Sequence, residues 1–149
     1  MNLVFREALI SDIPQIQEVR HSVKENTLSD PLLVTDDNCK KYITERGKGW
    51  VCEQDKKIVG FAIADLEGSN IWALFVRPEN EKNQIGKRLH DTMLEWYFSS
   101  TTTTVWLSTS PCTRAEQFYK HRGWKEAGMY GSKEVKLEMS YKNWMKKLK

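Results

Sequence analysis

Segment 81–88 of this sequence combines residue types suited to binding an anion. It reads Glu-Lys-Asn-Gln-Ile-Gly-Lys-Arg and follows an apolar run that ends at a proline. The first amides of a helix have no partner within the helix and lie at the positive end of its dipole. A helix that begins near Ile85 would therefore offer several N–H donors to a phosphate, and Gly86 would allow close approach. An ordinary solvated helix start has the same composition, so this segment alone leaves both interpretations open.

The second segment, 105–124, places a tyrosine on a capped helix. An apolar strand pattern ends at Ser-Thr-Ser-Pro, and Thr113 and Glu116 then stand at the spacing of a capping box. Gly123 suits the left-handed position that ends a helix. Tyr119 lies in the second turn, and a phenol with an ordinary pKa of ~10 stays protonated at neutral pH. The segment predicts a proton donor, while a tyrosine packed in the core is the simpler alternative.

The composition is that of a globular protein. The chain has 149 residues, of which 40% are hydrophobic and 29% are charged, which indicates one domain over residues 1–149. No apolar run approaches the ~20 residues that a membrane-spanning helix needs. The first residues lack a signal-peptide pattern, so we expect a cytoplasmic protein with no membrane partner.

The cysteines and histidines show no metal-binding spacing. Cys39, Cys52 and Cys112 form no C-x-x-C pair, and the three histidines are scattered, so we expect no metal site. The net charge of +3 is slight and much of it comes from the lysines after residue 141. A charge of this size does not favour a nucleic-acid partner.

The spacing of apolar residues predicts an alternation of strands and helices. In the first half of the chain we expect a strand at 2–8, a helix at 11–23, a loop at 28–34, a helix at 35–45 ended by Gly47 and Gly49, and a hairpin of 50–53 with 58–64. A strand at 71–76, stopped by Pro78, then leads to a long helix from Ile85 through Tyr97 and a polar loop at 99–104. The last part has a strand at 105–107, the tyrosine-bearing helix, and closing strands at 124–129 and 134–139. This order predicts a mixed α/β layer packed as one core.

With these elements in place, the sequence resembles the GNAT superfamily of acyl-CoA-dependent N-acetyltransferases over essentially its full length. The resemblance rests on L-F-V-R-P at 74–78, I-G-K-R-L at 85–89 and A-E-Q-F-Y-K-H-R-G-W at 115–124. It implies an α/β (α+β) fold with a mixed, mostly antiparallel sheet of six to seven strands. About four helices would flank this sheet, and two parallel strands would splay apart at its centre.

The resemblance also implies acetyl-CoA as co-substrate. Its pantetheine arm would lie between the strands around Phe75 and Val105, and backbone amides from about Asn83 to Lys87 would hold the pyrophosphate. The implied cofactor-binding residues are Phe75, Val76, Lys82, Asn83, Gln84, Ile85, Gly86, Lys87, Arg88, Cys112 and Phe118.

Four positions depart from the family pattern. Glu81 puts a negative charge near the pyrophosphate, and Gln84 stands where glycine is usual. Cys112 replaces an asparagine that often contacts the pantetheine arm, and Asn70 replaces a glutamate that can act as a base. We therefore expect weakened binding of coenzyme A and no general base at position 70.

The implied reaction is direct attack of a primary amine on the acetyl carbonyl. A backbone N–H near Val76 would stabilise the carbonyl oxygen, and Tyr119 would protonate the departing thiolate as general acid. The group that deprotonates the amine stays open among Glu53, Asp65, Glu67, His121 and a water chain.

The acceptor, a small-molecule or peptide amine, is not identified by any motif. Its pocket would form from residues 28–37, 65–72 and 129–134, where the acids hint at a cationic amine and Trp72 is a candidate lining residue. Trp144 and Met145 would either pair two chains as a homodimer or fold back on the domain.

Two other classes of function remain open. The irregular loop at Glu81 and Gln84 and the missing base at Asn70 fit a non-catalytic acyl-CoA-binding or regulatory module. The lysine tail and scattered aromatic residues fit, less well, a nucleic-acid-binding domain.

Overall fold

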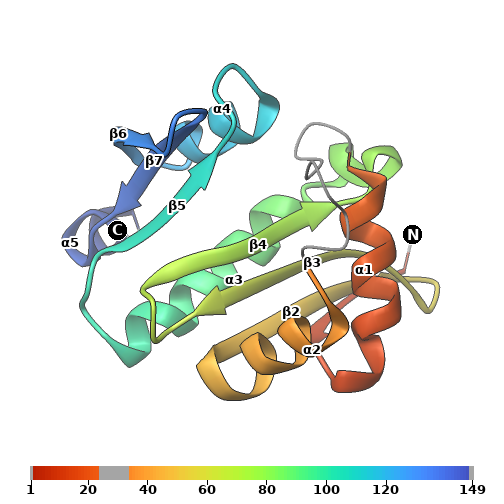
Figure 1. Ribbon diagram of the computed structural model, residues 1–149. Coiled ribbons are helices and arrows are strands. Elements are labelled where there is room, and N and C mark those ends of the chain that lie inside the picture. Colours follow the sequence, from red (N-terminus) through yellow and green to blue (C-terminus); the bar gives the residue numbers. More distant parts are fainter. Residues whose placement is uncertain (1, 24–33, 148–149) are drawn as a thin grey trace.

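The computed structural model describes residues 2–23 and 34–147, which are arranged on a single seven-stranded sheet (Figure 1). The strand order is β1-β2-β3-β4-β5-β7-β6, and every neighbouring pair is antiparallel except β4 and β5. The strands are β1 (Leu3–Glu7), β2 (Gly47–Gln54), β3 (Lys57–Asp65), β4 (Asn70–Val76), β5 (Val105–Thr109), β6 (Lys125–Tyr130) and β7 (Glu134–Met139). The predicted mixed, mostly antiparallel sheet is confirmed.

Helices cover both faces of this sheet. In Figure 1 α1 and α2 lie in front of it and α3 lies behind it. The helices are α1 (Ile13–Ser22), α2 (Asp36–Lys41), α3 (Ile85–Ser100), α4 (Arg114–His121) and α5 (Tyr141–Lys147), with 3₁₀ turns at Ile10–Asp12 and Pro78–Asn83 and a π turn at Tyr42–Arg46. Their apolar faces form two buried clusters, one between the sheet and α1–α2 and the other between the sheet and α3–α5.

Most predicted element bounds hold within a few residues. The second helical segment, α2 followed by the π turn, runs from Asp36 to Arg46 and has Gly47 as its C-cap, as predicted, but Gly47 and Gly49 also begin a strand. Both belong to β2, which is therefore longer than the predicted strand. A Cβ on Gly47 would overlap the carbonyl oxygen of Ala64, and one on Gly49 would lie 2.9 Å from Cγ2 of Ile43. These glycines are needed for close strand and helix packing, which the local sequence does not reveal.

The remaining differences are small. The predicted loop at 28–34 lies outside the described residues except for Val34, and α3 extends to Ser100, so part of the polar tract at 99–104 is helical. Trp144 is buried against Phe98 and His90, which confirms that it folds back on the domain. No helix in ranges 2–23 and 34–147 has the length and apolar character required to cross a bilayer.

Strands β4 and β5 part immediately after their first contact. Within the described chain they pair at one position, Asn70 opposite Trp106. The Asn70 side chain donates to the carbonyl of Trp106 at 3.0 Å, and the Trp106 indole donates to the carbonyl of Gly68 at 3.1 Å. Asn70 therefore anchors the closed end of the splay, and the implied opening between the two central parallel strands is confirmed.

A bulge in β4 lies beside this opening. Ile63 of β3 opposes Ala73, and the next residue, Ala64, opposes Ile71, so Trp72 is the additional residue. A bulge re-aims the side chains around it and is frequent next to functional sites. Here Trp72 stacks on Tyr42 with ring centroids 4.2 Å apart, on the face of the sheet that α1 and α2 cover.

Candidate active site

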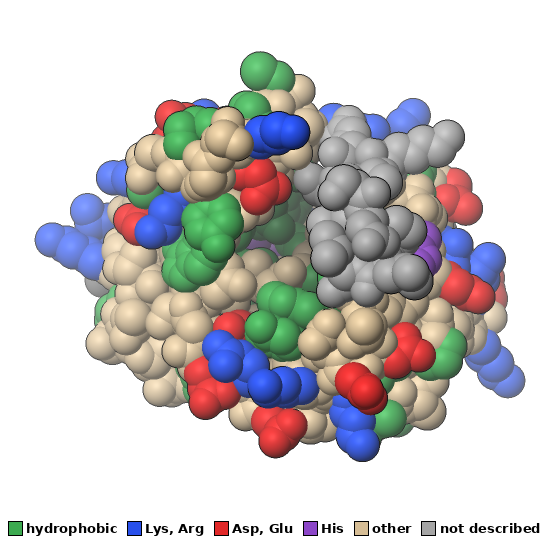
Figure 2. Space-filling view, viewed as in Figure 1, with side chains coloured by type: hydrophobic (Ala, Val, Ile, Leu, Met, Phe, Trp, Pro, Cys, Tyr) green, Lys and Arg blue, Asp and Glu red, His purple; other side chains and the backbone are tan. Residues whose placement is uncertain are grey.

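The splay between β4 and β5 holds a cavity of about 960 Å³. This volume lies within the range of cofactor and substrate sites, roughly 300–1,000 Å³. In Figure 2 the surface is hollowed near the middle of the view, with hydrophobic side chains in and around the hollow. The lining comes from α1, β4, the segment 81–87, β5, α4 and the start of β7.

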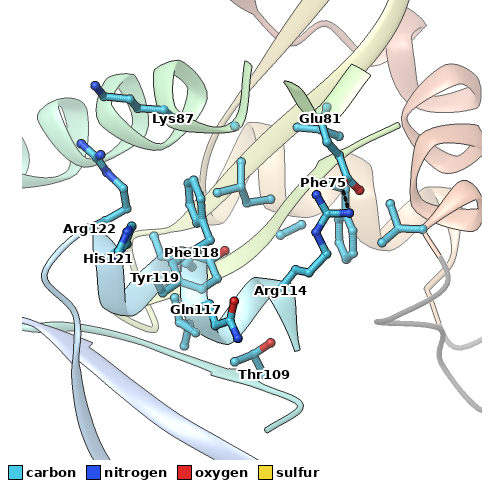
Figure 3. A pocket seen from close by; sticks show the side chains of 18 of the residues that line it. Phe75, Glu81, Lys87, Thr109, Arg114, Gln117, Phe118, Tyr119, His121 and Arg122 are labelled. Carbon is cyan, nitrogen blue, oxygen red and sulfur yellow. Dashed lines mark ion pairs between the residues drawn. The ribbon is translucent and has the colours of Figure 1, made fainter. Parts of the chain in front are cut away.

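Helix α4 brings Tyr119 to this cavity (Figure 3). Thr113 caps the helix by accepting a hydrogen bond from the Glu116 amide at 3.3 Å, and Gly123 has the predicted left-handed backbone with φ of +98°. The Glu116 carboxylate accepts from the amide of Cys112 at 2.8 Å, one residue earlier than the capping box requires. The cap and the glycine fix where the helix begins and ends, and hence where its second turn faces.

The phenol of Tyr119 is buried and protonated. The residue is 7% exposed and packs edge-on against Trp124, with ring centroids 5.5 Å apart. Burial raises the pKa of Tyr119 above its ordinary value, because the charged phenolate loses solvation. Within the described ranges no side chain or backbone group is hydrogen-bonded to its hydroxyl. A neutral phenol with a free proton therefore lines the cleft.

His90 of α3, which the sequence interpretation missed, packs behind Tyr119. Its ring centroid lies 6.3 Å from that of Tyr119, and the residue is completely buried. Nε2 accepts from the Trp124 indole at 2.9 Å, and Nδ1 donates to Asp91 at 2.8 Å. Burial lowers the pKa of His90 despite the favourable contact with Asp91, so the imidazole is neutral. His90 couples α3 to the end of α4, and its only sequence signal is its place on a core-facing helix.

The start of α3 contributes part of the predicted phosphate site. Gln84 takes the left-handed backbone, with φ of +58°, directly before the helix begins at Ile85. The predicted residues of this segment that line the cavity are Lys82, Gln84, Gly86 and Lys87. The helix start is therefore where the sequence predicted it, and two lysines lie beside it.

Other predicted cofactor residues point elsewhere. The Arg88 guanidinium lies over the ring of Phe5, 3.9 Å from its centroid, and the Ile85 side chain is buried in the core. Asn83 lines a smaller, separate pocket, and Cys112 is exposed outside the cavity lining. Helical periodicity explains why the side chains of Arg88 and Ile85 turn away from the cavity, because consecutive residues of a helix cannot face the same side.

Strand β4 presents backbone groups to the cleft. The Arg77 amide donates to the carbonyl of Val59 at 2.8 Å, and Val76 lies opposite Gly60 of β3. Because hydrogen-bonded and non-hydrogen-bonded pairs alternate along an antiparallel ladder, the amide of Val76 points away from β3 and toward β5. Phe75 and Val76 line the cavity from one side and Phe118 from the other.

The acidic residue that the sequence placed beside the phosphate site is paired. Glu81 and Arg114 form an ion pair at 2.6 Å, drawn as a dashed line in Figure 3. Glu81 belongs to the segment before α3, whereas Arg114 is the first residue of α4. The positive guanidinium offsets the charge that Glu81 would otherwise present to an anion.

Of the predicted bases, only His121 lines the cavity. Glu53 pairs with Arg6 at 2.5 Å, and Asp65 accepts two hydrogen bonds from Arg46 at 3.1 and 2.8 Å. Glu67 also lies near Arg46, at 3.7 Å. These three carboxylates serve the packing of the sheet and its loops, not the cleft.

Glu134, at the start of β7, has a carboxylate that lines the cavity but was not among the bases predicted from the sequence. It accepts a hydrogen bond from the Ser108 hydroxyl at 2.8 Å. Val135 and Leu107 pack toward α3, so their neighbours Glu134 and Ser108 face the α1 side of the sheet, because side chains alternate along a strand. The period-two pattern of 134–139 could have indicated this direction, but not which neighbour Glu134 meets.

Comparison with known proteins gives matches to one family. The model of the acetyltransferase (GNAT) family matches residues 12–124. The solved structures similar to this chain include the PaiA N-acetyltransferase of Thermoplasma acidophilum in complex with coenzyme A, at a TM-score of 0.81 and 19% identity, covering 95% of this chain and 100% of that one.

Two further structures have similar scores. An N-acetyltransferase of Staphylococcus aureus matches at a TM-score of 0.79 and 15% identity, over 95% of this chain and 99% of that one. The ribosomal-protein-alanine N-acetyltransferase of Brucella melitensis matches at 0.75 and 18% identity, over 92% and 99%. At such identities the likeness establishes the fold. No curated protein matches the sequence.

Proposed function

The chain belongs to the acetyltransferase (GNAT) family and is an acyltransferase with acetyl-CoA as co-substrate; from this premise we propose that it acetylates a primary amine by direct attack, with Tyr119 as general acid. The acceptor is a small-molecule or peptide amine, and the activity belongs to a single domain over residues 1–149. The observation that carries the proposal is the protonated phenol lining the cleft where β4 and β5 part.

The residues of the cleft fit coenzyme A. The start of α3 offers backbone N–H donors to a pyrophosphate, and Lys82 and Lys87 add positive charge beside it. The carbonyl of Val76 also points away from β3 into the gap between the strands, where an N–H of an amide-rich arm could donate to it. Apolar side chains such as Phe75 and Phe118 exclude water from the same gap.

Different residues around the splay would then carry out different steps of the reaction. Bound acetyl-CoA supplies the acetyl group and a thiolate leaving group. The Val76 amide would stabilise negative charge on a carbonyl oxygen, a task that needs no titratable group. Tyr119 donates its Oη proton to the leaving sulfur, and its raised pKa means that the phenol carries this proton at neutral pH.

The amine must lose a proton before it attacks, and we propose Glu134 for this task. Its carboxylate lines the cavity and faces the α1 side of the sheet, and Ser108 holds one oxygen by a hydrogen bond. Asn70 cannot accept a proton, and its side chain is engaged with the Trp106 carbonyl. His121, exposed on α4, is the other titratable candidate retained from the sequence.

A transfer assay with a panel of primary amines tests the proposal. Release of free coenzyme A is followed with each amine, and binding of coenzyme A is measured separately by calorimetry. We expect amine-dependent release by the native chain and a strong loss of turnover in Tyr119→Phe with unchanged binding. Binding without transfer to any amine would instead support a non-catalytic acyl-CoA-binding module.

A further inference from the structure

Arg20, in the last turn of α1, is a half-buried cation that lies against three aromatic rings. Its guanidinium carbon lies 5.1 Å from the ring centroids of Trp72 and Phe75 and 5.6 Å from that of Phe61. The faces of aromatic rings attract a cation, and such contacts help to stabilise a guanidinium that has lost part of its hydration. They do not satisfy its N–H donors.

The guanidinium has no anionic partner in the described chain. Its Nε and Nη2 atoms are buried and lack any hydrogen-bond acceptor. The one titratable neighbour that influences it is the buried thiol of Cys39, which is neutral because burial raises the pKa of that thiol. Burial lowers the pKa of Arg20 itself, but an arginine stays charged at neutral pH. Buried N–H donors of a charged group that lack an acceptor are costly, so this arrangement favours an anionic partner.

The nearby acids do not supply that partner. Asp65 is bound by Arg46, and Asp36 accepts from Gln17 at 3.3 Å. Glu18, on the same helix as Arg20, pairs with Arg77 at 3.4 Å. The sequence hint of a cationic acceptor rested partly on Asp36, Asp37, Asp65 and Glu67, and the pairing of Asp65 and Glu67 with Arg46 weakens that basis. Asp30, which also contributed to the hint, lies outside the described residues.

Arg20 opens onto the same cavity as Tyr119. It lines this cavity together with Val23, Trp72 and Phe75, on the α1 face of the sheet. Glu134 and Ser108 lie on that same face but across the splay, on β7 and β5. The cavity therefore has a cationic group on the β3–β4 side and a carboxylate on the β5–β7 side.

We propose that Arg20 is a specificity-determining residue that binds an oxyanion, a carboxylate or a phosphate, carried by the acceptor amine. The inference rests on the proposed acetyl transfer and names its substrate class: an amine that also bears an anionic group. A planar guanidinium can donate two parallel hydrogen bonds to such a group. The anion would hold the acceptor at Arg20 while its amine faces the acetyl group and Glu134.

Matched amine pairs test this inference. The acetylation rates of 4-aminobutyrate and n-butylamine, and of O-phosphoethanolamine and ethanolamine, are compared at saturating acetyl-CoA. We expect kcat/KM to be about 10- to 100-fold higher for the anionic member of at least one pair, because a hydrogen bond to a charged group is lost without it. The two pairs distinguish a carboxylate from a phosphate acceptor.

The variant Arg20→Met keeps the side-chain length and removes the charge. It should abolish the preference for the anionic amine, so that the ratio of kcat/KM between the two members of each pair falls to within about twofold of one. Lys40→Met removes an equal charge from the exposed face of α2, outside the cavity, and should retain the preference. Equal preference in the native chain and Arg20→Met, or native preference for the neutral amine, would overturn the inference.

A binding measurement separates this inference from the proposed function. The protein loaded with coenzyme A is titrated calorimetrically with the same four amines. Tighter binding of an anionic amine that is lost in Arg20→Met supports the subsite even if no amine is acetylated, in which case the transfer proposal fails alone. Absence of any Arg20-dependent binding, together with amine acetylation, would refute the subsite and leave the transfer proposal standing.

Discussion

Oε2 of Glu81 lies 2.6 Å from Nη1 of Arg114, and this ion pair connects the segment before α3 to the first turn of α4 across the cleft (Figure 3). The sequence alone predicts that Glu81 repels a pyrophosphate at the start of α3. In the folded chain its charge is offset by an arginine that stands 33 residues later. The effect of Glu81 on cofactor affinity therefore depends on Arg114.

This relationship predicts the effects of single and double substitutions. Arg114→Gln should weaken binding of coenzyme A about two- to fivefold, because Glu81 would then face the pyrophosphate unpaired; the pair is partly exposed, which keeps the effect small. The double variant Glu81→Gln/Arg114→Gln should recover most of the affinity in calorimetric titration. Lys133→Gln is the control for net charge. Equal weakening in the single and double variants would mean that Arg114 contacts the cofactor directly.

Tyr119→Phe should lower kcat by about 100-fold or more, because the leaving thiolate loses its proton donor. The dissociation constant of coenzyme A should not change, since the ring remains packed on Trp124. Tyr141→Phe on α5 removes a phenol outside the cleft and serves as control. A kcat like that of the native chain would remove Tyr119 from the mechanism.

The raised pKa of Tyr119 has its own consequence for activity at high pH. A general acid acts only while protonated, and burial moves ionisation of this phenol above its ordinary pKa of ~10. The native enzyme should therefore show no loss of kcat attributable to Tyr119 as pH rises from 7 to 10. A decline in that range that disappears in Tyr119→Phe would contradict the raised pKa of Tyr119 but would still support its role as proton donor.

Glu134→Gln should reduce kcat/KM for the amine by about 10- to 100-fold at neutral pH, because an amide cannot accept the proton of the amine. Binding of coenzyme A should be unaffected. Glu138→Gln is a matched control, because Glu138 lies on the same face of β7 but outside the cavity. A native rate in Glu134→Gln with a reduced rate in His121→Gln would move the base to His121.

The burial of His90 predicts how the stability of the fold changes in mild acid. Its folded pKa is lowered by burial, so at acidic pH the unfolded chain binds a proton that the folded chain does not. The free energy of unfolding should fall as pH drops below the ordinary histidine pKa of ~6.5, by about 1.4 kcal/mol for each unit that separates the folded and unfolded values. The loss should end below the folded pKa.

Urea unfolding between pH 8 and 5 measures this loss. His90→Gln keeps an acceptor for the Trp124 indole and a donor for Asp91 but does not titrate, so its stability should vary less with pH. His21→Gln, on the exposed side of α1, should behave like the native chain. An unchanged pH dependence in His90→Gln would show that other groups cause it.

The sequence by itself determined the elements whose signals are local. The cap at Thr113, the left-handed Gly123 and the helix start at Ile85 depend on neighbours within a few residues, and all three were predicted correctly. The order of elements along the chain and the motifs around Phe75, Gly86 and Tyr119 were sufficient to predict the family, and the family resemblance implied the open pair of central strands.

Only the tertiary structure decided which charges meet. Arg20, Glu134 and His90 carry no distinctive local pattern, and each takes its role from residues that are distant in sequence: the rings of Phe61 and Phe75, the hydroxyl of Ser108, and the indole of Trp124. Burial, unpaired donors and ion pairing are properties of these long-range contacts. The periodicity of a helix or strand indicates which side a residue faces, but not what lies there.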